Sequence, residues 1–152
     1  TSCCVQRRQG ARCWNPQLSL LLVKLEYSGA SIEEVWLVRE ATGLRYAIVY
    51  NLSSGTEPLT PLQLDWRSDG LGFTQGGLLP KDCISLKVLK EPMSPETLLG
   101  HLRELELSVY DPALFNSQHF CEYLFGLIDG ETTTGTGQAS ASAVAVQWPI
   151  EV

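Results

Sequence analysis

The segment at residues 114–126 constrains this chain most, because it combines helix signals with reactive side chains. It follows Asp111-Pro112, a natural helix start, and it stops at Gly126, a residue common just past a helix end. Four of its residues are spaced three or four apart and would share one helix face: Leu114, Ser117, Cys121 and Leu124. The pattern therefore predicts a helix that presents a hydroxyl and a thiol beside its apolar anchors.

Residues 116–120 read Asn-Ser-Gln-His-Phe, which resembles the Asn-Cys-Glu-His-Phe box of the H-box/NC family. These lecithin:retinol acyltransferase-like proteins have an NlpC-type permuted papain fold, in which an H-box strand precedes the NC helix. Residues 43–50, Gly-Leu-Arg-Tyr-Ala-Ile-Val-Tyr, resemble that H-box, usually His-Trp/Tyr-Ala/Gly-Ile-Tyr. The resemblance covers roughly residues 32–126 and, within the family, is greatest to the 2A proteins of some picornaviruses, of the kobuvirus and parechovirus type.

Both reactive positions of the family pattern are substituted. The resemblance places Arg45 where the catalytic histidine of the family stands and Ser117 where its nucleophilic cysteine stands. Papain-like enzymes hold that nucleophile at a helix N-terminus, because the helix dipole stabilises a thiolate. The framework residues of the pattern are retained: Tyr46, Asn116, His119 and Phe120. The resemblance therefore implies the frame of a hydrolase without its reactive pair.

Arg45 and Ser117 do not form a catalytic pair as aligned. A serine hydroxyl stays protonated at neutral pH unless a base removes its proton, and a guanidinium never deprotonates in a protein. His119 lies two residues from Ser117, so on a helix the two side chains point in nearly opposite directions. We interpret His119 as a hydrogen-bonded framework residue and predict that the chain is not an enzyme.

Three further points bear on whether the chain could still be an enzyme. Cys121 lies one turn beyond Ser117 and is the fallback nucleophile, although a buried cysteine is more often an inert small hydrophobe. His101 falls on the polar side of its expected helix, where we expect it to be solvated. Ser117 could itself replace a natural cysteine to trap an inactive form, but Arg45 argues against this because trapping needs only one change.

The direction of the Arg45 side chain is open at this point. Inside the groove, an arginine would be costly unless it were paired with a carboxylate or a bound anion. There, beside Ser117 and a helix N-terminus, it could bind phosphate or carboxylate. Pointing outward, it would have no such role.

The composition fits one globular domain. The chain has 152 residues, 44% of them hydrophobic and 18% charged, without a run of eighteen apolar residues. Five cysteines without a regular framework favour a reducing compartment. Because the chain begins at Thr1 and shows no signal peptide, we interpret it as a fragment or a segment released from a longer precursor.

Charge is distributed unevenly along the chain. Residues 1–25 contain four basic residues and no acid, so they carry +4; because the whole chain carries −6, the other 127 residues carry −10. Arg7, Arg8 and Arg12 could therefore contact RNA or a membrane surface, although a solvated terminal arm is the simpler interpretation.

Two other kinds of site have weaker support. Trp36, Trp66 and Phe73 could form a nucleic-acid surface, but the acidic body and the lack of an RNA-binding motif favour core or loop packing. The cysteines at positions 3, 4 and 13 could supply zinc thiolates, but no second pair completes four ligands. We expect neither a metal nor a cofactor.

The domain expectation has three parts: a basic N-terminal arm at residues 1–17, an H-box/NC-like domain at 18–128 and a flexible C-terminal tail at 129–152. Strands are expected at 34–39, 45–50 and 78–88, and helices at 94–109 and 111–126. Residues 18–25 fit a strand or a buried helix, and residues 51–77 are turn-rich. The expected class is α+β, a small antiparallel sheet packed against two helices, permuted papain-like.

Two function classes follow. The first is a non-catalytic H/NC-type viral 2A-like protein that acts by binding host factors or the viral proteins of a replication complex. It would do so in the host-cell cytoplasm, including at replication membranes. The second is a cellular phospholipase/acyltransferase-like enzyme that modifies lipids with a thiol or serine nucleophile. The framework residues favour the second class, whereas Arg45 and Ser117 count against it.

Overall fold

The computed structural model describes residues 12–40, 45–76 and 82–134. The elements in chain order are α2 (Pro16–Tyr27), β1 (Ala30–Arg39), β2 (Tyr46–Ser54), β3 (Glu57–Pro58), β4 (Leu62–Arg67), β5 (Gly70–Gln75), β6 (Asp82–Met93), α3 (Pro95–Glu104), α4 (Ser117–Gly126) and β7 (Gly130–Thr134). The expected α+β class is confirmed, but the sheet is larger than expected and has seven strands, and the described residues form three helices rather than two.

The strands form one antiparallel sheet in the order β5-β4-β2-β1-β6-β7, with the short β3 paired to β2. β1 and β2 form an antiparallel hairpin over the two strands expected at 34–39 and 45–50, with Arg39 opposite Tyr46. They lie at the centre of the sheet, and this explains their sequences: the run from Val35 to Val38 is buried on both faces, as in a central strand.

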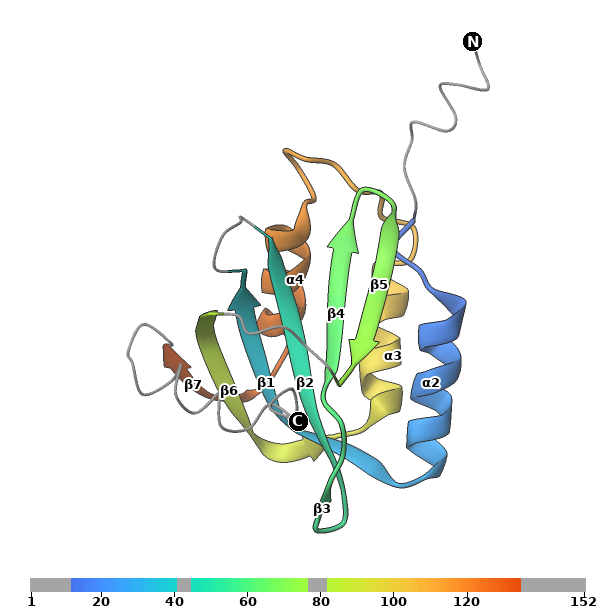
Figure 1. Ribbon diagram of the computed structural model, residues 1–152, viewed down its shortest axis with the longest axis vertical. Coiled ribbons are helices and arrows are strands. Elements are labelled where there is room, and N and C mark those ends of the chain that lie inside the picture. Colours follow the sequence, from blue (N-terminus) through green and yellow to red (C-terminus); the bar gives the residue numbers. More distant parts are fainter. Residues whose placement is uncertain (1–11, 41–44, 77–81, 135–152) are drawn as a thin grey trace.

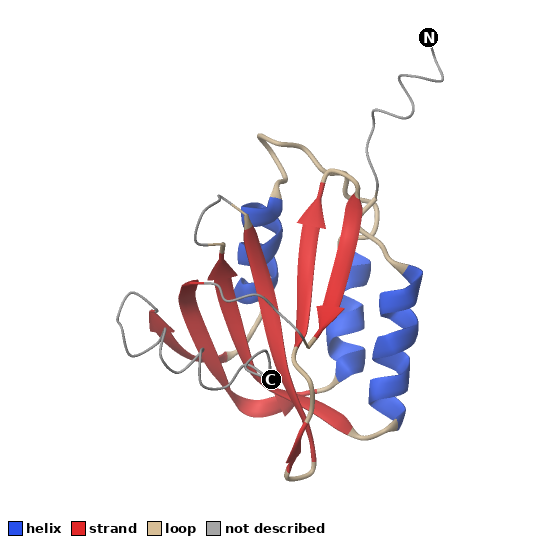
Figure 2. Cartoon of the chain, viewed as in Figure 1, coloured by secondary structure: helices blue, strands red, loops and turns tan. Residues whose placement is uncertain are grey.

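The helices cover one face of the sheet (Figures 1 and 2). α4 lies behind the central strands, and α2 packs beside α3. Their apolar sides join alternate strand residues in the main core, which includes Leu22, Leu98 and Phe120 from the helices and Ile48 and Leu64 from the sheet. α3 begins as expected, because Ser94 caps it and Pro95 occupies its first turn, but it ends at Glu104 rather than at residue 109.

The opposite face of the sheet carries a second, smaller apolar cluster. Its buried members are Trp36, Val38, Ala47, Val49 and Cys83, all from β1, β2 and β6. Two alternating sets of strand residues thus face two separate cores, as the side-chain period of two in a strand requires. The central part of the sheet is therefore buried on both sides.

One assignment that the sequence left open is settled by the structure, and one expectation needs correction. Residues 18–25 belong to a helix, which begins after Asn15 because the Asn15 side chain caps the amides of Gln17 and Leu18. The turn-rich stretch at 51–77 contains three strands, with Gly70 at the first position of β5. Glycine is a weak strand former, so Gly70 indicated a turn, and the strand β5 that pairs with β4 was not predicted.

The expected domain boundaries are also wrong at both ends. Cys13 is buried and its amide donates to the Ser108 carbonyl, so the folded part begins before residue 18. At the other end, residues 130–134 form β7 at the edge of the sheet rather than a tail. Residues 1–11, with Arg7 and Arg8, and residues 135–152 lie outside the described ranges.

In the described parts of the chain, no helix has the length and apolar character needed to cross a membrane.

The close approach of β7 to β6 generates the first prediction. A Cβ at Gly130 would lie 2.5 Å from the Val88 carbonyl oxygen, so Gly130→Ala must push the backbones apart. We expect the free energy of unfolding to fall by about 1–3 kcal/mol, as for other overpacked sites, in urea denaturation. Gly126→Ala is the matched control, because a Cβ there meets nothing within 4 Å. Equal stability of Gly130→Ala and the parent would contradict the prediction.

Candidate functional site at the start of helix α4

Helix α4 begins at Ser117, later than the expected start at Asp111-Pro112. The Asp111 side chain instead accepts hydrogen bonds from the amides of Ala113 and Leu114, which closes a turn before the helix. Leu114 consequently lies outside the helix and is 79% exposed, so it is not an apolar anchor of that helix. The prediction that Ser117, Cys121 and Leu124 share a buried face is confirmed.

The N-terminus of α4 is held by a reciprocal cap. The Asn116 side chain accepts from the amides of Gln118 and His119, and the Asn116 amide donates to His119 Nδ1 at 3.0 Å. His119 therefore serves as the acceptor of the cap, in agreement with its interpretation as a framework residue. Its ring turns toward the backbone before the helix and not toward the Ser117 hydroxyl.

Ser117 meets the start of β2. Its Oγ accepts a hydrogen bond from the Tyr46 amide at 3.1 Å, across 71 residues of sequence. The pairing of β2 with β4 starts only at Ile48, so the hydroxyl satisfies an amide near the end of that ladder. Residues 45 and 117, which the resemblance aligns with a catalytic pair, are therefore brought together. Ser117 is only 7% exposed.

The Arg45 side chain lies at the rim of the site. It is 55% exposed, and its Nε lies 3.7 Å from Glu40 Oε1. Two hollows flank it, with volumes of about 360 and 520 Å³, and both are lined by Arg45, Tyr110 and Ser117. Arg67 contributes to one hollow and Arg39 to the other. Arg45 is thus neither buried in the groove nor turned away from it.

An aromatic cluster supports this part of the molecule. Trp66 packs against Tyr110, Phe115 and Phe120, with ring centroids 5.6–5.9 Å apart, and its indole N–H donates to the Phe115 carbonyl. The cluster ties β4 to the turn before α4. Trp36 and Trp66 are both buried, so they belong to the cores, in agreement with the packing interpretation of these aromatics.

The fallback nucleophile is poorly suited to attack. Cys121 is fully buried in the main core, and burial raises the pKa of its thiol well above the ordinary value, with Asp65 and Glu122 adding to the shift. Only a thiolate is a strong nucleophile, so a buried protonated thiol is inert. Cys121 therefore has the environment of a core residue, in agreement with its interpretation as an inert small hydrophobe.

His101 differs from its expected solvated state. The side chain is partly buried on α3, and its Nδ1 is buried without a hydrogen-bond partner. Burial lowers the pKa of His101, while nearby Glu104 opposes that shift. None of the hydrogen bonds among the described residues links His101 to Ser117 or Cys121, and it does not line the hollows beside Arg45.

The three cysteines considered as zinc ligands lie partly inside and partly outside the described residues. Within residues 12–40, 45–76 and 82–134, no three His, Cys, Asp or Glu side chains are grouped to hold a metal ion. Cys13 is buried, which raises the pKa of its thiol to about 12. Cys3 and Cys4 lie outside the described residues.

Three residues of the site were not found from the sequence: Arg39, Arg67 and Tyr110. They come from β1, from the end of β4 and from the turn after α3, and only the sheet order and the Trp66 packing place them beside Ser117. No local spacing connects them, so no sequence signal could have assigned them to one site.

Comparison of the chain with protein-family models, with curated proteins and with solved structures found no match. The likeness to the H-box/NC family accordingly rests on the motif residues themselves.

Proposed function

We propose that this chain is a non-catalytic H-box/NC-type protein of the picornaviral 2A kind, which acts by binding a host factor or a replication-complex protein. The observation that carries the proposal is the meeting of Arg45 and Ser117 at the starts of β2 and α4. The position beside the hydroxyl holds a permanent cation, and Arg45 cannot remove the hydroxyl proton. The hydroxyl instead accepts a hydrogen bond from the Tyr46 amide, which is a structural role.

The charge of the site indicates the kind of partner. Arg39, Arg45 and Arg67 surround the start of α4, whose amide groups add partial positive charge. Glu40 and Asp69 only partly offset them. In a chain with a net charge of −6, this is a local basic surface. We therefore assign it to an acidic segment of a partner protein, met in the host-cell cytoplasm or at replication membranes.

The acyltransferase alternative would require a different nucleophile. Cys121 is buried with a raised thiol pKa, and among the described residues no hydrogen bond links His101 or His119 to the side chain of Ser117 or Cys121. These observations favour the binding class over the lipid-modifying enzyme.

The absence of acyl chemistry is directly testable. The native chain, incubated with a fluorophosphonate or with a thioester acyl donor, should gain no adduct at Ser117 or Cys121 by intact-mass and peptide mass spectrometry. The double variant Arg45→His/Ser117→Cys is the positive control, because it restores a thiol and a base at the two adjacent positions. A stoichiometric acyl adduct on the native chain would overturn the non-catalytic part of the proposal.

The binding part makes a separate prediction. Acetyl-Val-Glu-Val-amide should shift the amide resonances of Tyr46, Ser117 and Gln118 in a saturable way, and its glutamine analogue should bind more weakly. Arg45→Gln should weaken the acidic peptide at least about fivefold, because it removes a charge-assisted contact.

Arg103→Gln is the matched control, since Arg103 is exposed on α3 and lines neither hollow beside Ser117. Equal weakening by both variants, or shifts confined to other elements, would contradict an acidic-partner site.

A further inference from the structure

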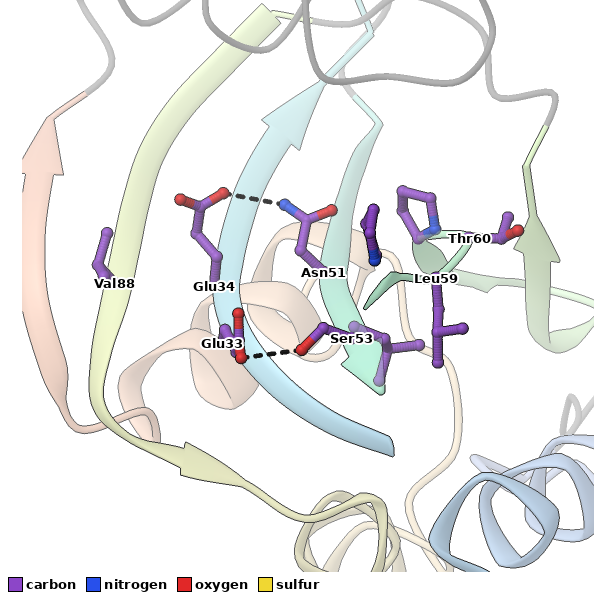
Figure 3. Close-up of a pocket in the computed structure, with 10 residues that line it drawn as sticks. Glu33, Glu34, Asn51, Ser53, Leu59, Thr60 and Val88 are labelled. Atoms are coloured by element: carbon purple, nitrogen blue, oxygen red, sulfur yellow. Dashed lines mark hydrogen bonds between the residues drawn. The ribbon is translucent and has the colours of Figure 1, made fainter. Parts of the chain in front are cut away.

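The face of the sheet opposite the helices contains a hollow of about 600 Å³ (Figure 3). It lies over β1, β2 and β6 and is closed on one side by the segment at residues 58–61. Its walls combine two acidic side chains, Glu33 and Glu34, with apolar surface from Leu59 and Val88. The hollow shares no lining residue with the basic site beside Ser117.

A β-bulge brings both carboxylates to this face. Neighbouring residues of a strand normally point to opposite faces, but the register of β1 shifts between Ile32 and Glu34 against both β2 and β6. Ile32 therefore faces the main core, whereas Glu33 and Glu34 both reach the hollow. Bulges of this kind often re-aim side chains beside binding sites.

Each carboxylate is held in place through one oxygen. Glu34 Oε1 accepts from Asn51 Nδ2 at 3.0 Å and from Trp36 Nε1 at 2.8 Å, and Glu33 Oε2 accepts from Ser53 Oγ at 2.8 Å. Among the described residues, no hydrogen bond reaches Glu33 Oε1 or Glu34 Oε2 in the structure. The hollow thus presents two fixed carboxylates, each with one oxygen available to a ligand.

No described lysine or arginine lines the hollow. Lys87 is the nearest in sequence to Val88, but its Nζ turns to the other face and donates to the carbonyls of Phe125 and Ile128. The negative charge of the two glutamates is therefore not neutralised from within the lining. A ligand that fits this site carries a cation with several donors beside an apolar group.

We propose that this hollow binds an arginine side chain from an extended, otherwise apolar segment of a partner protein. A guanidinium offers five N–H donors in one plane, enough to reach both open carboxylate oxygens at once. The residues that flank the arginine pack on Leu59 and Val88. This assignment concerns the opposite face of the sheet and does not depend on the function proposed for the Ser117 site.

The test is an NMR titration of the full chain with acetyl-Val-Arg-Val-amide. The amides of Glu33, Glu34, Asn51 and Ser53 should shift in a saturable way, and higher salt should weaken binding. The same peptide with citrulline in place of arginine has nearly the same shape without the charge, and should bind at least about fivefold more weakly.

Glu34→Gln should produce a similar loss of at least about fivefold for the arginine peptide. This variant keeps an oxygen acceptor for Asn51 and Trp36, so the fold is preserved, and unchanged amide shifts outside the hollow will verify this. Glu106→Gln is the matched control, since Glu106 is exposed beyond α3 and does not line the hollow.

Three outcomes would overturn the proposal. They are equal binding of the arginine and citrulline peptides, an equal effect of Glu34→Gln and Glu106→Gln, and an absence of saturable shifts at the hollow. Shifts of the same amides on raising the protein concentration alone would assign the hollow to a second copy of the chain and would also contradict it.

Discussion

The hydrogen bond from the Tyr46 amide to Ser117 Oγ joins the two halves of the site. It links the first residue of β2 to the first residue of α4, and the rest of the local structure keeps these two ends in place. The Asn116–His119 cap fixes the start of the helix, and Trp66 packs against the turn before it. Because Ser117 is buried and its hydroxyl already accepts a hydrogen bond from the Tyr46 amide, the residue has a structural role.

Arg45 sets much of the charge at the start of α4. An arginine beside the helix start adds to the positive potential there, whereas a histidine would have supplied a base. The groove beside Ser117 is therefore suited to attract anions. The opposite face carries the reverse charge, through Glu33 and Glu34. The sheet thus separates a basic surface from an acidic one.

Local signals predicted several elements correctly. The start of a helix near residue 94, the end of the last helix at Gly126 and a strand overlapping residues 78–88 were predicted correctly, because they depend on neighbours in sequence. β5 and β7 were not predicted from the sequence. Gly70 and Gly130 suggested turns, and only long-range pairing with β4 and β6 makes these segments strands. The β-branched threonines at 132–134 were the one signal that could have indicated β7.

The site was predictable in part for the same reason. The motif residues pointed to Arg45 and Ser117, and the structure places them at one groove. The roles of Arg39, Arg67 and Tyr110 depend on sheet order, and the bulge that aims Glu33 toward the hollow depends on the register of three strands. Neither feature has a local sequence signature.

Amide hydrogen exchange at Tyr46 in Ser117→Ala tests the central claim most directly, that Ser117 acts as the acceptor joining β2 to α4. The Tyr46 amide should exchange at least about tenfold faster than in the parent when each is compared with the Ile48 amide, which lies in the β4 ladder and corrects for any global loss of stability. An unchanged ratio of Tyr46 to Ile48 exchange would mean that the two ends do not meet, and would contradict the account of the site.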